Sequence, residues 1–65
     1  MIASGTVDTI HGKWKWQLDI GHAAKLVWAI EAPDGSKRAG IFGWDTTVRE
    51  AREHVQSWIR RRVEN

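Results

Sequence analysis

Hydrophobic and polar residues alternate along two segments of this chain. The first, residues 12–21 (GKWKWQLDIG), and the second, residues 25–32 (KLVWAIEA), place an apolar residue at every other position. Because successive side chains of a strand point to opposite faces, this alternation predicts two strands, each buried on one face and exposed on the other. The residues expected on the buried face are Trp14, Trp16, Leu18 and Ile20, then Leu26, Trp28, Ile30 and Ala32.

A turn motif, Pro33-Asp34-Gly35, follows the second segment. Proline presets φ at the first central position of a turn, and glycine accepts the positive φ that closes a hairpin. A third strand over residues 36–44 (SKRAGIFGW) is therefore expected to run antiparallel to the second. Phe42 should face the core and Ile41 the opposite side, unless a bulge at Gly40 reverses the two.

The last third of the chain has the pattern of an amphipathic helix. Thr47 and Glu50 have the spacing of a capping box, with Asp45 and Thr46 as competing caps. From there, the residues that recur at helical spacing are Val48, Ala51, Val55, Trp58, Ile59 and then Arg62 or Val63. This stripe predicts a helix with one apolar face.

These elements predict an α+β fold in a single domain spanning residues 1–65. We expect a three-stranded antiparallel β-meander with one C-terminal amphipathic α-helix packed on one face. Residues 6–10 (TVDTI), which precede His11-Gly12, are a candidate fourth strand. A chain of 65 residues has room for one hydrophobic core. One helix covers one face of such a sheet, so the other face is expected to stay open.

The composition argues against several classes of function. The chain has no Cys, which excludes disulfides and Cys-based zinc sites, and its three His show no metal-ligand spacing. It has no phosphate-binding glycine loop and no nucleophile beside an obvious base, so we expect no metal, no cofactor and no enzymatic activity. No signal-peptide pattern and no apolar run of about 18 residues are present, so we expect a cytoplasmic protein that does not enter a membrane.

The open face of the predicted sheet mixes basic residues with a small apolar centre. The net charge is only +2, a weak electrostatic footprint for nucleic acid. The candidate nucleic-acid or partner-binding residues are Lys13, Lys15, Gln17, Lys25, Lys37 and Arg38. The candidate apolar anchors for a partner are Trp14, Val27, Ile41 and Trp44.

The order of elements resembles the AP2/ERF and phage-integrase arm-type DNA-binding domains. The residues that carry the resemblance are Gly12-Lys13-Trp14, Trp28-x-Ile30 with Pro33-x-Gly35, and Gly40-x-Phe42 before Thr47-Val48-Arg49-Glu50-Ala51. The likeness covers about residues 12–60. It implies that the helix-free face enters the major groove of duplex DNA, with Lys15, Gln17, Lys25, Lys37 and Arg38 as reading and clamping residues and Lys13 on a phosphate. The helix start is also similar to HicB-like antitoxin domains.

Three hypotheses follow from the sequence. The first is a small module that binds double-stranded DNA through the helix-free face. The second is a protein-interaction module, an inhibitor or regulator of a larger complex, because interfaces favour Trp and Arg anchors. The third is a homodimer formed by an edge strand that begins at Lys13 or Lys37.

Overall fold

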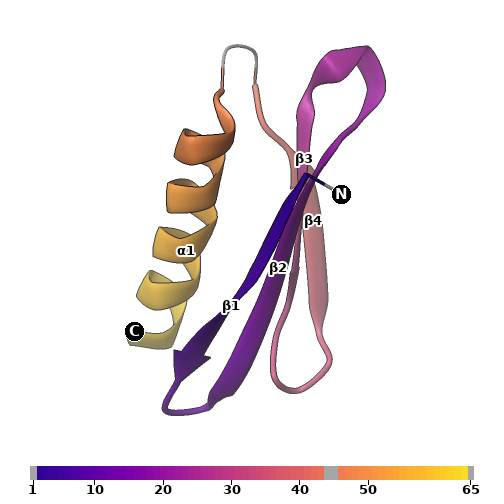
Figure 1. The fold of residues 1–65 in the computed structure, drawn as a ribbon. Coiled ribbons are helices and arrows are strands. Elements are labelled where there is room, and N and C mark those ends of the chain that lie inside the picture. The colour runs from indigo at the N-terminus through magenta and orange to yellow at the C-terminus, as the bar shows by residue number, and fades with distance from the viewer. Residues whose placement is uncertain (1, 44–45, 65) are drawn as a thin grey trace.

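The computed structural model describes residues 2–43 and 46–64 and shows one antiparallel sheet with one helix on one face (Figure 1). Its elements are β1 (Ala3–Thr9), β2 (Gly12–Ile20), a short 3₁₀ turn (His22–Ala24), β3 (Leu26–Glu31), β4 (Lys37–Ile41) and α1 (Val48–Glu64). The strands lie in chain order, β1-β2-β3-β4, and each pairs antiparallel with the next. The predicted α+β meander with a C-terminal helix is confirmed.

The candidate fourth strand is present and longer than the segment expected for it. β1 pairs with β2 along its whole length, from Ala3 opposite Leu18 to Thr9 opposite Gly12. Because β1 flanks β2, the strand that contains Lys13 lies inside the sheet. The prediction that this strand forms an edge is therefore wrong, and the two edges are β1 and β4.

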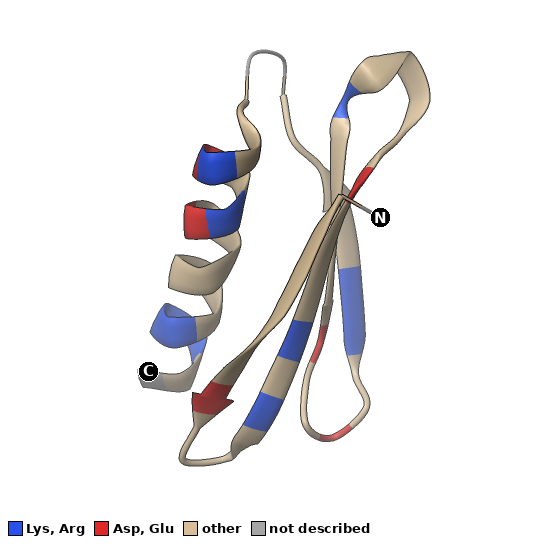
Figure 2. Cartoon of the chain, in the orientation of Figure 1, with Lys and Arg blue, Asp and Glu red and all other residues tan. Residues whose placement is uncertain are grey.

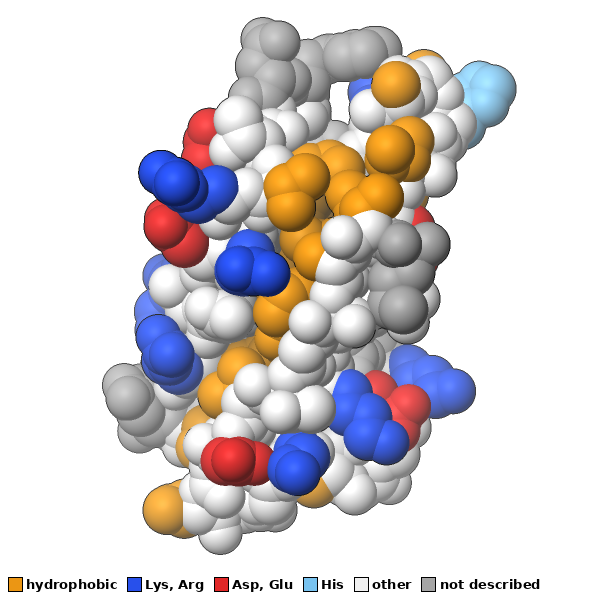
Figure 3. All heavy atoms as spheres, in the orientation of Figure 1, with side chains coloured by type: hydrophobic (Ala, Val, Ile, Leu, Met, Phe, Trp, Pro, Cys, Tyr) orange, Lys and Arg blue, Asp and Glu red, His pale blue; other side chains and the backbone are white. Residues whose placement is uncertain are grey.

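The core lies between α1 and the central strands β2 and β3. Hydrophobic side chains are visible along the seam between the helix and the sheet, with charged side chains on the outer side of the helix (Figure 3). The buried residues are Trp16 and Leu18 of β2, Leu26 and Ile30 of β3, and Ala51, Val55 and Ile59 of α1. The three helix residues are spaced four apart and so share one face, as the apolar stripe predicted.

Two residues predicted to be buried are exposed. Ile20 of β2 is 62% exposed and Val48 of α1 is 42% exposed. Ile20 ends β2 and Val48 begins α1, so each lies at the end of its element, where fewer neighbouring side chains cover it. The hydrophobic pattern placed both residues on the correct face of their element, but it did not show that the contact between helix and sheet ends before it reaches them.

β4 has the register that needs no bulge. Val27 pairs with Ile41, and the Phe42 N–H donates to the Leu26 carbonyl oxygen at 2.8 Å. Ile41 is 67% exposed on the helix-free face, whereas Phe42 packs against the core.

A glycine lies under each of two tryptophan rings. Gly5 of β1 pairs with Trp16, and Gly40 of β4 pairs with Trp28. A Cβ added to Gly5 would lie 2.7 Å from the Trp16 ring, and one added to Gly40 would lie 2.6 Å from the Trp28 ring. Both edge strands therefore use glycine so that a ring of the neighbouring strand can lie across them.

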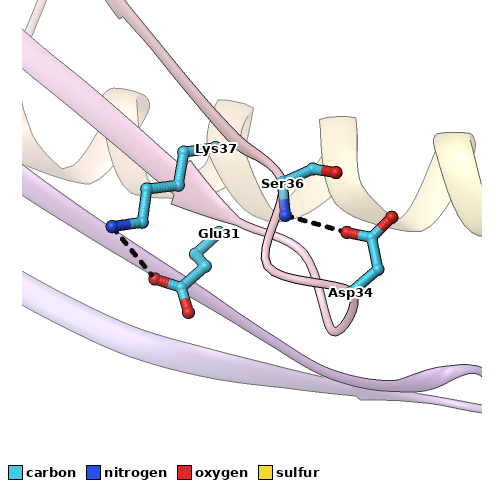
Figure 4. A network of polar contacts seen from close by, with 4 residues as sticks. All are labelled: Glu31, Asp34, Ser36 and Lys37. Carbon is cyan, nitrogen blue, oxygen red and sulfur yellow. Dashed lines mark hydrogen bonds and ion pairs between the residues drawn. The ribbon is translucent and has the colours of Figure 1, made fainter.

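The turns on either side of β3 differ in how well their sequences suit them. In the β3–β4 turn, Gly35 has a φ of 93° and the Asp34 Oδ1 accepts the Ser36 N–H at 2.9 Å, as the Pro-Asp-Gly motif predicted (Figure 4). In the β2–β3 turn, Ala23 and Ala24 have φ values of 59° and 60°. Positive φ is unfavourable for residues with a Cβ, so this second turn is strained.

The Thr47 cap at the start of α1 is confirmed. The Thr47 hydroxyl oxygen accepts the Glu50 N–H at 3.1 Å, and the same hydroxyl donates to the Glu50 Oε1 at 3.1 Å, so the Glu50 side chain bonds the Thr47 hydroxyl. Thr46 instead donates to the Gly43 carbonyl oxygen at 3.2 Å, and Asp45 lies outside the described residues.

Candidate functional site

The helix-free face of the sheet carries the lysines predicted from the sequence, but each has an acidic neighbour. Residues that pair across an antiparallel sheet share a face. Lys13 pairs with Asp8, and Glu31 pairs with both Lys15 and Lys37. The Lys37 Nζ lies 3.9 Å from the Glu31 Oε2, and the two side chains point toward one another (Figure 4).

The strand residues of this face have no net charge. Three lysines, Lys13, Lys15 and Lys37, are matched by three carboxylates, Asp8, Asp19 and Glu31. Attraction to phosphate depends on an excess of positive charge. The structure thus brings together most of the predicted residues, in an arrangement with little long-range attraction for DNA.

The remaining predicted polar residues lie toward the other end of this face. Gln17 donates a side-chain hydrogen bond to the Asp19 Oδ2 at 3.1 Å. Lys25 precedes β3 and is half-buried, so it is less accessible to a partner than the exposed lysines of β2 and β4.

The apolar centre of the helix-free face is present. Val27 pairs with Ile41, and Ala29 pairs with Ala39, so the four side chains form one small patch across β3 and β4. Ile41 is its most prominent member. The predicted anchors Val27 and Ile41 therefore lie together.

Arg38 lies on the opposite face from the lysines. It pairs with Ile30, a buried core residue, so it is on the helix side of the sheet. Its guanidinium carbon lies 5.9 Å from the centroid of the Trp58 ring of α1. Grouping Arg38 with Lys37 as readers on one face is therefore wrong, because neighbouring residues of a strand point to opposite sides.

A second basic group surrounds Trp58. The Arg62 guanidinium carbon lies 5.2 Å from the Trp58 ring centroid, so this ring has an arginine from β4 and one from α1 against it. A hollow next to the ring is lined by His54, Trp58, Arg61 and Arg62. We call Arg38, Trp58, Arg61 and Arg62 the arginine surface.

The arginine surface differs from the helix-free face in its charge. Within residues 2–43 and 46–63, no carboxylate lies within ion-pair distance of Arg38, Arg61 or Arg62. Basic positions of β2, β4 and the last turns of the helix gather toward one end of the molecule (Figure 2). Among the described side chains, Lys37 forms an ion pair with Glu31, while Lys13 and Lys15 have a carboxylate opposite them on the neighbouring strand. Arg38 and Arg62 line one hollow together with Asp34, which lies beyond ion-pair distance of both.

Trp14, one of the two tryptophans proposed as anchors, is not on the open face. Trp14 lies on the core side, where its ring meets the Trp58 ring edge to face at 6.3 Å between centroids. The Trp14 indole N–H is buried and finds no acceptor among the described residues. Trp44 lies outside the described residues.

Sequence reasoning missed Arg61 and Arg62 as site residues. Trp58 and Arg62 are four positions apart on α1 and therefore neighbours on one helix face, a spacing that can be read directly from the sequence. Trp58 and Arg62 approach Arg38 because of the way the helix lies on the sheet, and no local sequence pattern predicts that arrangement.

Comparisons with protein-family models, curated proteins and solved structures find no match. The resemblance to the AP2 and integrase arm-type domains stays a prediction. No helix in the described part of the chain is long and apolar enough to cross a bilayer. Among the same residues, no three acidic or histidine side chains gather as metal ligands would.

Proposed function

We propose that the protein binds duplex DNA, and that the arginine surface makes the contacts. The observation that carries this proposal is that Arg38 and Arg62 flank the Trp58 ring at 5.9 and 5.2 Å with no carboxylate partner among the described side chains. The proposal keeps the DNA partner expected from the sequence and moves the contact surface to the other side of the sheet.

The chemistry of the group suits phosphate. A guanidinium group presents its N–H donors in a planar fork that matches two phosphate oxygens. Contact with an aromatic ring restricts the long arginine side chain before binding, so less conformational entropy is lost when a phosphate is bound. Two such arginines from different elements give a fixed spacing of positive charge.

The arrangement favours backbone contacts over base reading. The Trp58 ring is half-buried and already has arginines against it, so it is poorly placed to stack on a base. Contacts with phosphates carry no direct sequence information. We therefore expect binding with little sequence preference and a Kd of roughly 10⁻⁴ to 10⁻⁶ M, the range of nonspecific DNA binding.

The test compares two charge-matched triple variants. One replaces Arg38, Arg61 and Arg62 with Gln, and the other replaces Lys13, Lys15 and Lys37 with Gln. Binding to a short fluorescent duplex is followed by anisotropy over a range of salt concentrations. If three phosphates are contacted, log K should fall with log salt at a slope of about −2.7, or about 40-fold between about 50 and 200 mM salt.

The proposal predicts that the arginine variant loses most of this affinity and slope, while the lysine variant keeps both. A single Arg62→Gln change should reduce the slope by about 1. Thermal unfolding of each variant checks that the fold is intact. The reverse ranking would place the site on the helix-free face, and the absence of salt-dependent binding by the wild type would reject DNA binding altogether.

A second candidate function is protein binding through the helix-free face. The observation that favours it is Ile41, which is 67% exposed beside Val27, Ala29 and Ala39 on a face whose strand residues carry no net charge. Neutral surfaces with an apolar centre are typical of protein interfaces.

Wild-type protein, Ile41→Lys and Ile10→Lys serve as baits in nuclease-treated lysate. Ile10 is 91% exposed in the β1–β2 turn and so provides a matched control. A stoichiometric partner held by the wild type and by Ile10→Lys, but lost by Ile41→Lys, supports this function. A partner that binds all three baits equally, or no partner, counts against it.

A further inference from the structure

β4 has a free edge that can accept another strand. It pairs with β3 on one side and is the last strand of the sheet. The helix packs against β1, β2 and β3, so its main contacts are away from β4. An exposed row of unpaired backbone groups is a template for pairing with another chain.

The backbone groups that point outward can be identified from the register. The Ala32 N–H donates to the Ser36 carbonyl oxygen, and the Phe42 N–H donates to the Leu26 carbonyl oxygen, both at 2.8 Å. Because the direction of these groups alternates along an antiparallel strand, Arg38 and Gly40 also point toward β3. The N–H and C=O groups of Lys37, Ala39 and Ile41 therefore point away from the sheet.

We propose that a second copy of this chain pairs with β4 and continues the sheet. The two β4 strands would run antiparallel about a two-fold axis at Ala39, so that Ala39 of each copy pairs with Ala39 of the other. This register pairs all five residues of each strand. Each outward-pointing pair would exchange two hydrogen bonds.

The side chains of β4 are complementary to themselves in this register. Lys37 would lie opposite Ile41 of the second copy on the helix-free face. Arg38 would lie opposite Gly40 on the helix side, beside the Trp28 ring that already covers this glycine. No like charges lie directly opposite each other, the arrangement that destabilises a strand pair most; the two Arg38 residues are diagonal neighbours, about 7–8 Å apart, and each guanidinium lies against the Trp58 ring of its own copy.

Lys37 is a weak obstacle to this pairing. A lysine on an edge strand commonly blocks the approach of another strand. Here the Lys37 side chain is 76% exposed, but its Nζ lies 3.9 Å from the Glu31 Oε2 of β3, so the ammonium group points along its own sheet and not toward an approaching strand (Figure 4).

The other edge is less suited to a second copy. A hollow at β1 is lined by residues from Thr6 to Ile10 together with Gln56, Arg60 and Val63 of α1. Helix side chains therefore reach this edge, and a two-fold axis there would bring the two helices together. At β4 the corresponding axis keeps both helices on one side of the joined sheet, separated by the two β4 strands, which lie outside the main helix contacts.

This pairing has a consequence that rests on the proposed function. Both arginine surfaces would lie on the same side of the joined sheet, facing each other across the two β4 strands. The pairing itself needs no DNA, so it is tested in the absence of nucleic acid.

The natural chain has no Cys, so single cysteines report on pairing without interference. In a hydrogen-bonded antiparallel pair the two Cα atoms are about 5.5 Å apart, within the range that a disulfide spans. Ala39→Cys should therefore crosslink two copies on mild oxidation. Thr6→Cys, in the middle of β1, is the matched control on the other edge.

Paired thiols meet at an effective concentration in about the millimolar range, so at about 10 µM protein Ala39→Cys should crosslink about 100-fold faster than Thr6→Cys. Equal rates, or faster crosslinking of Thr6→Cys, would overturn the proposal. Sedimentation of the wild type should show a concentration-dependent dimer, and a strict monomer at the highest soluble concentration would likewise overturn it.

Ala39→Pro separates pairing from folding. The Ala39 N–H points away from β3, so proline removes a donor that only the second copy uses. We expect this variant to keep the circular dichroism spectrum of the wild type and to sediment as a monomer. A folded Ala39→Pro variant that still forms the dimer would show that β4 is not the interface.

Discussion

The contact between Gly5 and the Trp16 ring makes a sharp prediction about stability. A Cβ built on Gly5 lies 2.7 Å from Cζ2 and 2.9 Å from Cε2 of Trp16. Favourable carbon contacts are about 3.5–4.0 Å, so Gly5→Ala requires a shift of about 1 Å. Trp16 is 4% exposed and is held among core side chains, so the ring has little room to move.

The expected cost follows from two opposing effects. Forcing an extra methyl group into a well-packed site costs about 1–3 kcal/mol. Replacing glycine in a strand also gains about 0.5–1 kcal/mol, because the unfolded chain loses freedom. Gly43→Ala is the matched control, since a Cβ there has no neighbour within 4 Å. The difference between the two variants isolates the clash and should be about 1–3 kcal/mol.

The assay is reversible unfolding in urea, followed by tryptophan fluorescence and checked by thermal unfolding. For a domain of this size, 1 kcal/mol corresponds to a Tm change of about 4–8 °C. Gly40→Ala should fall between the other two variants, because its ring, Trp28, is half-buried and has more freedom to tilt than Trp16. The expected order of stability is Gly43→Ala, then Gly40→Ala, then Gly5→Ala.

A double-mutant cycle tests the cause of the effect. Trp16→Phe removes the ring atoms nearest Gly5 and should itself destabilise the core. In its presence Gly5→Ala should cost less, with a coupling energy of about 0.5–3 kcal/mol between the two positions. Equal stability of Gly5→Ala and Gly43→Ala, or strict additivity in the cycle, would refute the reasoning.

Three further predictions concern the turns and the helix cap. Hydrogen bonding from Ser36 lowers the pKa of Asp34 below its ordinary value of 3.8. The ionised Asp34 carboxylate therefore stabilises the fold fully above pH 3.8, and this stabilisation is lost as the pH falls through the lowered pKa of the folded state. Asp34→Asn, whose amide oxygen can accept the same bond, should flatten the acid limb of a stability–pH curve measured by urea titration. Ala24→Gly should stabilise the chain by roughly 0.5–1 kcal/mol in thermal unfolding, because relief of positive φ outweighs the entropy of glycine. Thr47→Ala should cost about 1 kcal/mol by urea titration, since the Glu50 N–H loses its cap, and a value near zero would contradict the observed bond.

The elements that could be predicted were those whose own sequence carries a strong pattern. The alternation of apolar residues predicted β2 and β3, and the apolar stripe that follows Thr47 in the sequence predicted α1. β1 was only a candidate because its sequence, ASGTVDT, is small and polar with one Val. The position of β1 in the sheet is set by the Trp16 ring of β2, which lies across Gly5. The need for a glycine opposite Trp16 comes from the sequence of β2, so it cannot be recognised in the sequence of β1 alone.

The charge of each face could not be predicted because it depends on register. Glu31 pairs with both Lys15 and Lys37 because β3 lies between β2 and β4. The separation of Lys37 from Arg38 could have been read from alternation alone. The sequence alone could not show that Arg38 and Arg62 approach the same ring, because this depends on where the helix lies on the sheet.

Register therefore explains why two basic groups of similar size differ in their neighbouring side chains. Lys13, Lys15 and Lys37 lie on strands of the helix-free face, and a neighbouring strand supplies a carboxylate opposite each of them, as Asp8 does for Lys13. Arg38 is on an edge strand, and its one cross-strand neighbour, Ile30, is apolar. The residue that approaches Arg38 from above is Trp58, which offers a ring face instead of a negative charge. An aromatic neighbour holds an arginine in place without neutralising it, and this is why we propose the arginine surface, and not the lysines opposite carboxylates, as the phosphate-binding group.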